Sequence, residues 1–293
     1  MDNQTLPQIQ TVGVVGCGLM GSGIVEVCAR AGYQVVVSEV SQEALHAGLG
    51  RLRQSLDKGL SRGKLSQEDH AATLDRVRGT TDLEDFAACD LVIEAVLENL
   101  EAKRQIFRRL DEICPWHSIL ASNTSSISIT KIAAATDRPE KVIGAHFFNP
   151  VPVMPLLELV RGLQTSEESY QALRAFGERL DKRIVVALKD NPGFIVNLLF
   201  VPYGLDAIRG LEQGVASMED FDTAMKLGMN HPMGPFELMD FVGLDTMLFI
   251  AEAMYEETKD PRYAAPPRLR QMVAAGMMGR KSGRGFYDYR AKG

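Results

Sequence analysis

The chain has 293 residues, of which 45% are hydrophobic, with a formal net charge of -6 and a sequence pI near 5.5. This length fits one large or two modest domains, and the acidic balance argues against nucleic acid as a partner, because duplex binding needs clustered basic residues. No apolar run reaches the ~18 residues of a membrane helix, the N-terminus has no signal-peptide pattern, and the cysteines form no C-x-x-C pair. We therefore expect a cytoplasmic protein with no membrane contact, disulfide framework or metal.

In chain order, the first elements are an apolar run at 11–16, a glycine loop, a helical stretch that reaches Arg30 and a second apolar run at 34–40. This succession of strand, turn, helix and strand builds parallel sheets with right-handed crossovers. Residues 41–78 are charged and favour helix, with breaks near Gly59 and Gly63. They predict a helical hairpin inserted after the second strand.

Five later apolar runs have the length of strands, and helical sequence separates most of them. They lie at 90–96, 118–123, 141–148, 156–160 and 183–190. Together they predict an α/β fold, a Rossmann-type doubly wound sheet that carries the inserted hairpin. After Pro192 the strand-like runs stop and helical segments dominate to about Gly276. We expect a Rossmann-like domain at 1–191 and an all-α C-terminal domain at 192–293.

The glycine loop has the G-x-G-x-x-G pattern of dinucleotide-binding proteins, in the required place between a strand and a helix. Its members are Gly16, Cys17, Gly18, Leu19, Met20 and Gly21. Glu39 lies at the end of the second apolar run, where a carboxylate accepts hydrogen bonds from the ribose hydroxyls and repels a 2′-phosphate. The pattern therefore favours NAD over NADP, and a glycine turn that only packs the helix is the structural alternative.

A histidine and a glutamate downstream suit removal of hydride from an alcohol carbon. His146 lies near the carboxyl end of the run 141–148, the edge where ligands bind in open parallel sheets. An adjacent strand would bring Glu158 to its ring, so that the imidazole takes the alcohol proton while the carboxylate fixes its tautomer. His46, His70, His117 and His231 have no such partner in the sequence and are expected to be solvated or to pack turns.

Motifs spread over nearly the whole chain resemble the L-3-hydroxyacyl-CoA dehydrogenase family, and most closely its short bacterial 3-hydroxybutyryl-CoA branch. They read GCGLMGSGI, IEAVLENLEAK, ILASNTSSISIT, HFFNPVPVM, NPGFIVN, HPMGPFEL, VGLDT and GRKSGRGFYDY. The resemblance implies NAD-dependent interconversion of a 3-hydroxyacyl-CoA, of short chain length, with its 3-oxoacyl-CoA. It also implies that 1–191 binds NAD, and that 192–293 contributes to substrate binding and forms a homodimer.

The resemblance carries further roles onto single positions. His146 and Glu158 match the catalytic pair, Ser125 the serine that hydrogen-bonds the reacting oxygen, and Asn197 the asparagine that assists from the helical domain. Residues matched to the neighbourhood of the cofactor are Glu98, Lys103, Ser125, Asn149 and Lys281. Ser125, Asn149 and Asn197 are also expected at the substrate, and SNTSS is in addition the kind of sequence that caps a helix.

The inserted hairpin carries the expected site for coenzyme A. Segment 51–64 is basic on an otherwise acidic chain, and phosphate attracts such charge. A solvated basic face is the simpler interpretation of such a run. Ser55 and Arg62 fall where the family has serine and lysine contacts to coenzyme A.

Three departures from the family pattern keep other functions open. Leu198 stands where arginine is usual, Pro155 where lysine is usual, and Leu205-Asp206-Ala207 where Asn-Glu-Ala is usual. One alternative is a dehydrogenase of a free hydroxy acid or sugar acid, as in the lambda-crystallin branch. Another is a non-catalytic dinucleotide sensor, because a fold alone does not fix function.

Overall fold

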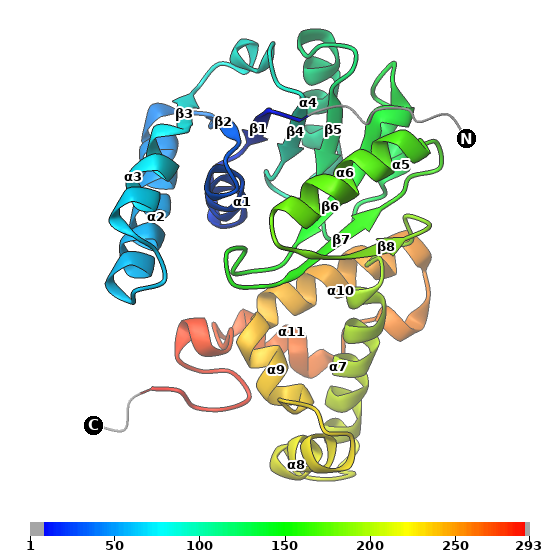
Figure 1. The fold of residues 1–293 in the computed structure, drawn as a ribbon. Coiled ribbons are helices and arrows are strands. Elements are labelled where there is room, and N and C mark those ends of the chain that lie inside the picture. The colour runs from blue at the N-terminus through cyan, green and yellow to red at the C-terminus, as the bar shows by residue number, and fades with distance from the viewer. Residues whose placement is uncertain (1–8, 291–293) are drawn as a thin grey trace. The chain divides into compact units, whose positions relative to one another are not determined.

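The computed structural model describes residues 9–290. These residues divide between Asp190 and Asn191 into two compact units. The first unit contains a sheet and its covering helices, and the second is helical (Figure 1).

The sheet of the first unit has eight strands in the order β3-β2-β1-β4-β5-β6-β7-β8. Their bounds are β1 (Thr11–Val15), β2 (Gln34–Ser38), β3 (Val77–Thr80), β4 (Leu91–Glu94), β5 (Ile119–Ser122), β6 (Val142–Phe147), β7 (Leu156–Val160) and β8 (Arg183–Ala187). The strands from β1 to β6 are parallel, whereas β7 is antiparallel to β6 and β8 is parallel to β7. The expected doubly wound sheet is thus confirmed, with the strand direction reversed from β7 onward.

Helices pack against this sheet, so its central strands are buried along their whole length. The helices are α1 (Leu19–Arg30), α2 (Gln42–Ser61), α3 (Gln67–Asp75), α4 (Leu100–Ile113), α5 (Ile129–Ala133) and α6 (Glu167–Arg179), with short 3-10 turns η1 (Leu83–Phe86) and η2 (Pro139–Lys141). Every residue of β4, β5 and β6 is buried. Continuous apolar runs are what a parallel sheet covered on both faces requires, which is why these strands were visible in the sequence.

The inserted hairpin consists of α2 and α3, and the chain then forms β3 beside β2. The expected hairpin, 41–78, includes the first two of the four residues of β3, because Val77-Arg78-Gly79-Thr80 is no apolar run and belongs to an edge strand with one neighbour. The expectation of a solvated His70 is wrong in part, since its Nε2 lies 2.8 Å from Oδ1 of Asp57 and joins α3 to α2.

The second unit is built from helices around a core rich in methionine. They are α7 (Val196–Glu212), α8 (Met218–Gly228), α9 (Pro235–Val242), α10 (Leu244–Thr258) and α11 (Pro267–Ala274), with 3-10 turns η3 (Pro261–Tyr263) and η4 (Arg280–Ser282). Met239, Met247 and Met254 are fully buried. Ser217 caps α8 by accepting from the Asp220 amide at 3.1 Å, and Pro267 opens α11, as their sequences predict.

The C-terminal tail is fastened to this unit by two buried carboxylates. Asp240 of α9 accepts from the amides of Phe286 and Tyr287, each at 2.9 Å. Asp222 of α8 accepts from the hydroxyl of Tyr287 at 2.8 Å. Burial raises the pKa of Asp240, and the two amide hydrogen bonds oppose that rise. Within residues 9–290, no helix combines the length and the apolar character needed to cross a membrane.

Candidate active site

The glycine loop after β1 is shaped by close backbone contacts. Gly16 has φ of +93°, and a Cβ atom there would lie 2.8 Å from the Ala95 carbonyl oxygen. A Cβ at Gly21 would lie 1.9 Å from the carbonyl oxygen of Gly16. At Gly18 a Cβ would meet no protein atom within 4 Å, so the fold itself does not require glycine at this position. A ligand that approaches the loop backbone at the start of α1 would require it.

Glu39 is attached to the glycine loop from the end of β2. Its Oε1 accepts from the Cys17 amide at 2.7 Å, and its Oε2 accepts from the Val40 amide at 3.2 Å. Arg51 of α2 donates to the Cys17 carbonyl oxygen at 2.8 Å. Burial raises the pKa of the Cys17 thiol to about 11, which Glu39 reinforces and Arg51 opposes. Cys17 is therefore a packing residue, and the half-exposed carboxylate of Glu39 is the charged feature of the loop.

A buried network holds the loop that carries Ser125. Oε1 of Glu98 accepts from the Ser125 amide at 2.7 Å and also from the hydroxyl of Thr124. Lys103, which is 1% exposed, lies 3.1 Å from Glu98 and 2.6 Å from Glu94. Burial raises the pKa of Glu98, but Lys103 and the hydrogen bonds from the Ser125 loop together hold that pKa below its ordinary value. Glu98 is thus a carboxylate that fixes three consecutive residues, Thr124 to Ser126.

Glu94 completes this network, and sequence reasoning missed it. Its Oε2 accepts from the Ser122 hydroxyl at 2.6 Å, and the two residues are register partners on β4 and β5. A carboxylate within the apolar run 90–96 was the available signal. Two apolar side chains near the same sheet edge are exposed: Val40, in the loop after β2, is 93% exposed, and Leu97, in the loop after β4, is 86% exposed.

His146 and Glu158 lie directly opposite each other on β6 and β7. Facing residues of an antiparallel pair have their side chains on the same face of the sheet. His146 Nδ1 is 2.8 Å from Glu158 Oε2, and Glu158 is fully buried. The ring of Phe148 lies against the imidazole, with centroids 4.5 Å apart. The pair is close to the carboxyl end of β6, the same edge at which the parallel β1 runs into the glycine loop.

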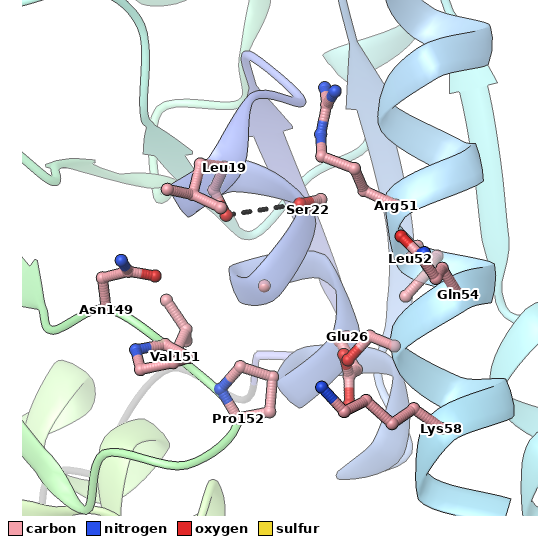
Figure 2. Close-up of a pocket in the computed structure, with 13 residues that line it drawn as sticks. Leu19, Ser22, Glu26, Arg51, Leu52, Gln54, Lys58, Asn149, Val151 and Pro152 are labelled. Atoms are coloured by element: carbon pink, nitrogen blue, oxygen red, sulfur yellow. Dashed lines mark hydrogen bonds between the residues drawn. The ribbon is translucent and has the colours of Figure 1, made fainter. Parts of the chain in front are cut away.

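A pocket of about 400 Å³ opens between α1, α2 and the loop that follows β6 (Figure 2). Asn149, Val151 and Pro152 form one wall, and α2 with Arg51 and Lys58 lies across α1 from them. The remaining lining residues are Leu19, Ser22, Gly23, Glu26, Leu52, Gln54, Ser55 and Pro150. Ser55 and Asn149, both expected at the substrate, therefore share this pocket, whereas Arg62 does not line it.

Two of the expected site residues, Asn197 and Lys281, belong to the helical unit, and their contacts are described within that unit. Asn197 is buried in the first turn of α7. Lys281 donates to Asp245 at 2.6 Å. Their expected roles at the substrate and the cofactor stay predictions. The described residues hold no cluster of histidine, cysteine, aspartate and glutamate that would bind a metal ion.

A glycine loop at the edge of a Rossmann-type sheet, with a carboxylate-paired imidazole at that same edge, defines the class of nicotinamide-dependent oxidoreductases. The comparisons with known proteins are more specific. The model described as "3-hydroxyacyl-CoA dehydrogenase, NAD binding domain" matches residues 11–191, and its C-terminal domain counterpart matches residues 193–289. The chain belongs to the 3-hydroxyacyl-CoA dehydrogenase family.

Curated relatives match almost the whole chain. A 3-hydroxybutyryl-CoA dehydrogenase of Mycobacterium tuberculosis is 50% identical over 96% of this chain and 99% of its own length. A probable 3-hydroxybutyryl-CoA dehydrogenase of Bacillus subtilis is 48% identical over 97% and 99%. The crystal structure of (S)-3-hydroxybutyryl-CoA dehydrogenase from Ralstonia eutropha superposes with a TM-score of 0.91 at 48% identity, covering 96% of this chain and 99% of that one.

Proposed function

We propose that the protein catalyses NAD-dependent oxidation of a short-chain (S)-3-hydroxyacyl-CoA to the 3-oxoacyl-CoA, and the reverse reduction, with His146 as the general base. The observation that carries the proposal is the 2.8 Å contact between His146 Nδ1 and the fully buried Glu158, at the sheet edge where the glycine loop begins. The names of the M. tuberculosis and B. subtilis relatives support 3-hydroxybutyryl-CoA as the substrate.

The chemistry requires a proton acceptor for the alcohol. With Nδ1 protonated and donating to Glu158, the imidazole carries its lone pair on Nε2, which accepts the proton of the substrate hydroxyl. Glu158 stabilises the imidazolium that results. In the reverse direction the protonated Nε2 donates to the carbonyl oxygen. Ser125 hydrogen-bonds the same oxygen, and Asn197 assists from α7.

The cofactor would be held by the glycine loop, with its pyrophosphate at the amides that open α1 and its ribose at Glu39. The open space at Gly18, where a Cβ would meet no protein atom within 4 Å, fits such a ligand. When bound, NAD accepts the hydride from the alcohol carbon. The negative charge of Glu39 disfavours the 2′-phosphate of NADP. Glu98, Lys103, Asn149 and Lys281 complete the proposed cofactor site, with Lys103 acting through Glu98.

Coenzyme A would occupy the pocket between α1 and α2. Ser55 and Lys58 line that pocket, and Arg51 adds a second cation to its wall. Arg62 follows α2 as its C-cap residue, where its charge would assist a phosphate beyond the pocket. The helical unit would form a homodimer in the cytoplasm, and α7 to α10 carry exposed apolar side chains suited to that contact. Among them are Leu199, Leu227, Phe241 and Phe249, and Met229 directly follows α8.

The decisive assay follows NADH consumption with acetoacetyl-CoA and compares it with free acetoacetate and with NADPH. We expect turnover of the thioester with NADH and little turnover with the other two combinations. Equal use of the free acid would favour the hydroxy-acid dehydrogenases instead. NADH binding without any turnover would favour the non-catalytic sensor.

A further inference from the structure

Lys182 is a buried lysine beside the loop that follows the catalytic strand. It is 8% exposed and directly precedes β8. Because β7 and β8 run opposite to β6, the start of β8 reaches the edge at which β6 ends. A residue from the end of the first unit is thereby brought to the segment 148–155, which directly follows β6.

The ammonium group of Lys182 binds that segment at two points. Its Nζ donates to the Val151 carbonyl oxygen at 2.6 Å and to the Met154 carbonyl oxygen at 2.7 Å. Hydrogen bonds from a charged donor are stronger than neutral ones, and an ammonium group is buried only where such acceptors compensate for lost water. The same segment closes on itself, since the amides of Val153 and Met154 both donate to Pro150 at 2.9 Å.

This segment is also a wall of the pocket assigned to coenzyme A. Asn149, Val151 and Pro152 line it (Figure 2). Val151 is buried against α1. A Cβ atom added to Gly23 of α1 would lie only 2.9 Å from the Cβ atom of Val151. The carbonyl group that Lys182 binds therefore belongs to a residue whose side chain shapes the pocket.

We propose that Lys182 is a positioning residue that fixes segment 148–155, and with it Asn149 and the wall of the acyl-CoA pocket. The proposal rests on the function proposed above. Lys182 does not line the pocket itself, so it acts through Val151 and Met154.

Charges around Lys182 give this role a dependence on pH. Burial lowers the pKa of Lys182; Asp181, Cys28 and Glu26 oppose that change, whereas Arg30 adds to it. Lys182 therefore loses its charge as the pH rises through a pKa that lies below the usual value for lysine. Above that pH, the two carbonyl groups face a neutral amine.

The test compares Lys182→Met and Lys182→Arg with the wild-type protein. In Lys182→Met we expect KM for acetoacetyl-CoA to rise about tenfold or more, because two charge-assisted hydrogen bonds are lost, with a smaller change in KM for NADH. The Arg variant keeps the charge, so it should recover most of the affinity. The alkaline rise in KM expected for wild type should move to higher pH in this variant. Lys141→Met is the matched control. Lys141 directly precedes β6 and forms its ion pair with Glu168, whereas segment 148–155 follows β6.

Hydrogen exchange provides a measurement that does not depend on activity. The amides of Val153 and Met154 should exchange faster in Lys182→Met than in wild type, while those of β6 keep their rates. Unchanged exchange in segment 148–155, or equal KM values in wild type and Lys182→Met, would overturn the proposal. Wild-type protein that turns over no acyl-CoA would refute the proposed function instead, and the exchange rates would still decide the role of Lys182.

Discussion

At the scale of single residues, the catalytic proposal depends on a carboxylate that gains its partner only through sheet pairing. Glu158 is fully buried, and a carboxylate without compensating contacts is costly in such a place. Its hydrogen bond to His146 Nδ1 relieves that cost and at the same time selects the imidazole tautomer that has its lone pair on Nε2. One contact thus serves both the fold and the proposed chemistry.

We expect His146→Gln to lower kcat by ~10²–10⁴, the usual contribution of a general base. Glu158→Gln should also lower kcat, because the amide can present its NH₂ group to Nδ1 and favour the wrong tautomer. Steady-state kinetics with acetoacetyl-CoA and NADH measure both effects, and NADH affinity and thermal midpoint should stay near wild type in His146→Gln. Near-normal kcat in that variant would refute the mechanism.

Glu39 is the residue on which cofactor preference depends. Glu39→Gln keeps an acceptor for the Cys17 amide but removes the charge beside the expected ribose. The ratio of kcat/KM for NADPH to that for NADH should rise by about tenfold, equivalent to ~1.4 kcal/mol. Glu43→Gln, on the exposed start of α2, is the control. A wild-type enzyme that used both cofactors equally would contradict the proposed NAD preference.

At the scale of elements, the ion pairs of Lys103 join α4 to Glu94 at the carboxyl end of β4 and to Glu98 in the loop after it, and Ser122 of β5 donates a hydrogen bond to the same Glu94. Lys103→Met would leave Glu94 and Glu98 buried without their cation, and we expect a loss of about 3–5 kcal/mol in the free energy of unfolding. Urea denaturation at neutral pH measures this loss. Arg108→Met on the exposed side of α4 should cost less than about 1 kcal/mol, because its pairing with Glu101 is solvent-exposed. Equal effects of the two substitutions would contradict the assigned role of Lys103.

The same network predicts how stability changes with acid. The pKa of Glu98 is lowered in the folded protein, so its contribution is present above the unfolded pKa of glutamate and is lost as the pH falls through the lowered folded value. In Lys103→Met the cation that depresses this pKa is absent. Acidification should therefore cost this variant less stability than it costs wild type, and the urea midpoints of the two proteins should converge as the pH falls.

The sequence predicted the elements that are apolar and continuous, and the site residues that lie at their ends. His146 and Glu158 were predicted because both lie in strand-like runs separated by a proline-rich turn. The contact of Glu94 with Ser122 could not be predicted, since it depends on the register of β4 against β5. Lys182 was missed for a similar reason: its place beside the loop after β6 follows from the reversed direction of β7 and β8, which no local pattern reveals.

At the scale of the whole molecule, the helical unit depends on its C-terminal tail. Asp240→Ala would remove the acceptor for the amides of Phe286 and Tyr287, at a cost of about 1–3 kcal/mol for each donor left unpaired. Hydrogen exchange of α9 amides should accelerate, while β1 and β4 should keep their rates. Asp288→Ala removes only an exposed pairing with Arg290, so it should change neither the stability of the helical unit nor the exchange rates of the α9 amides. Unchanged exchange in α9 would show that the tail adds nothing to the unit.

The same tail imposes an order on biosynthesis. Every strand of the eight-stranded sheet lies before residue 190, so the first unit can fold while the ribosome is still translating the second. Asp222 and Asp240 must await Phe286 and Tyr287, which are translated after every described helix of the second unit. A nascent chain that stalls before residue 286 would therefore carry a finished first unit and an unfinished helical unit, exposed to proteases.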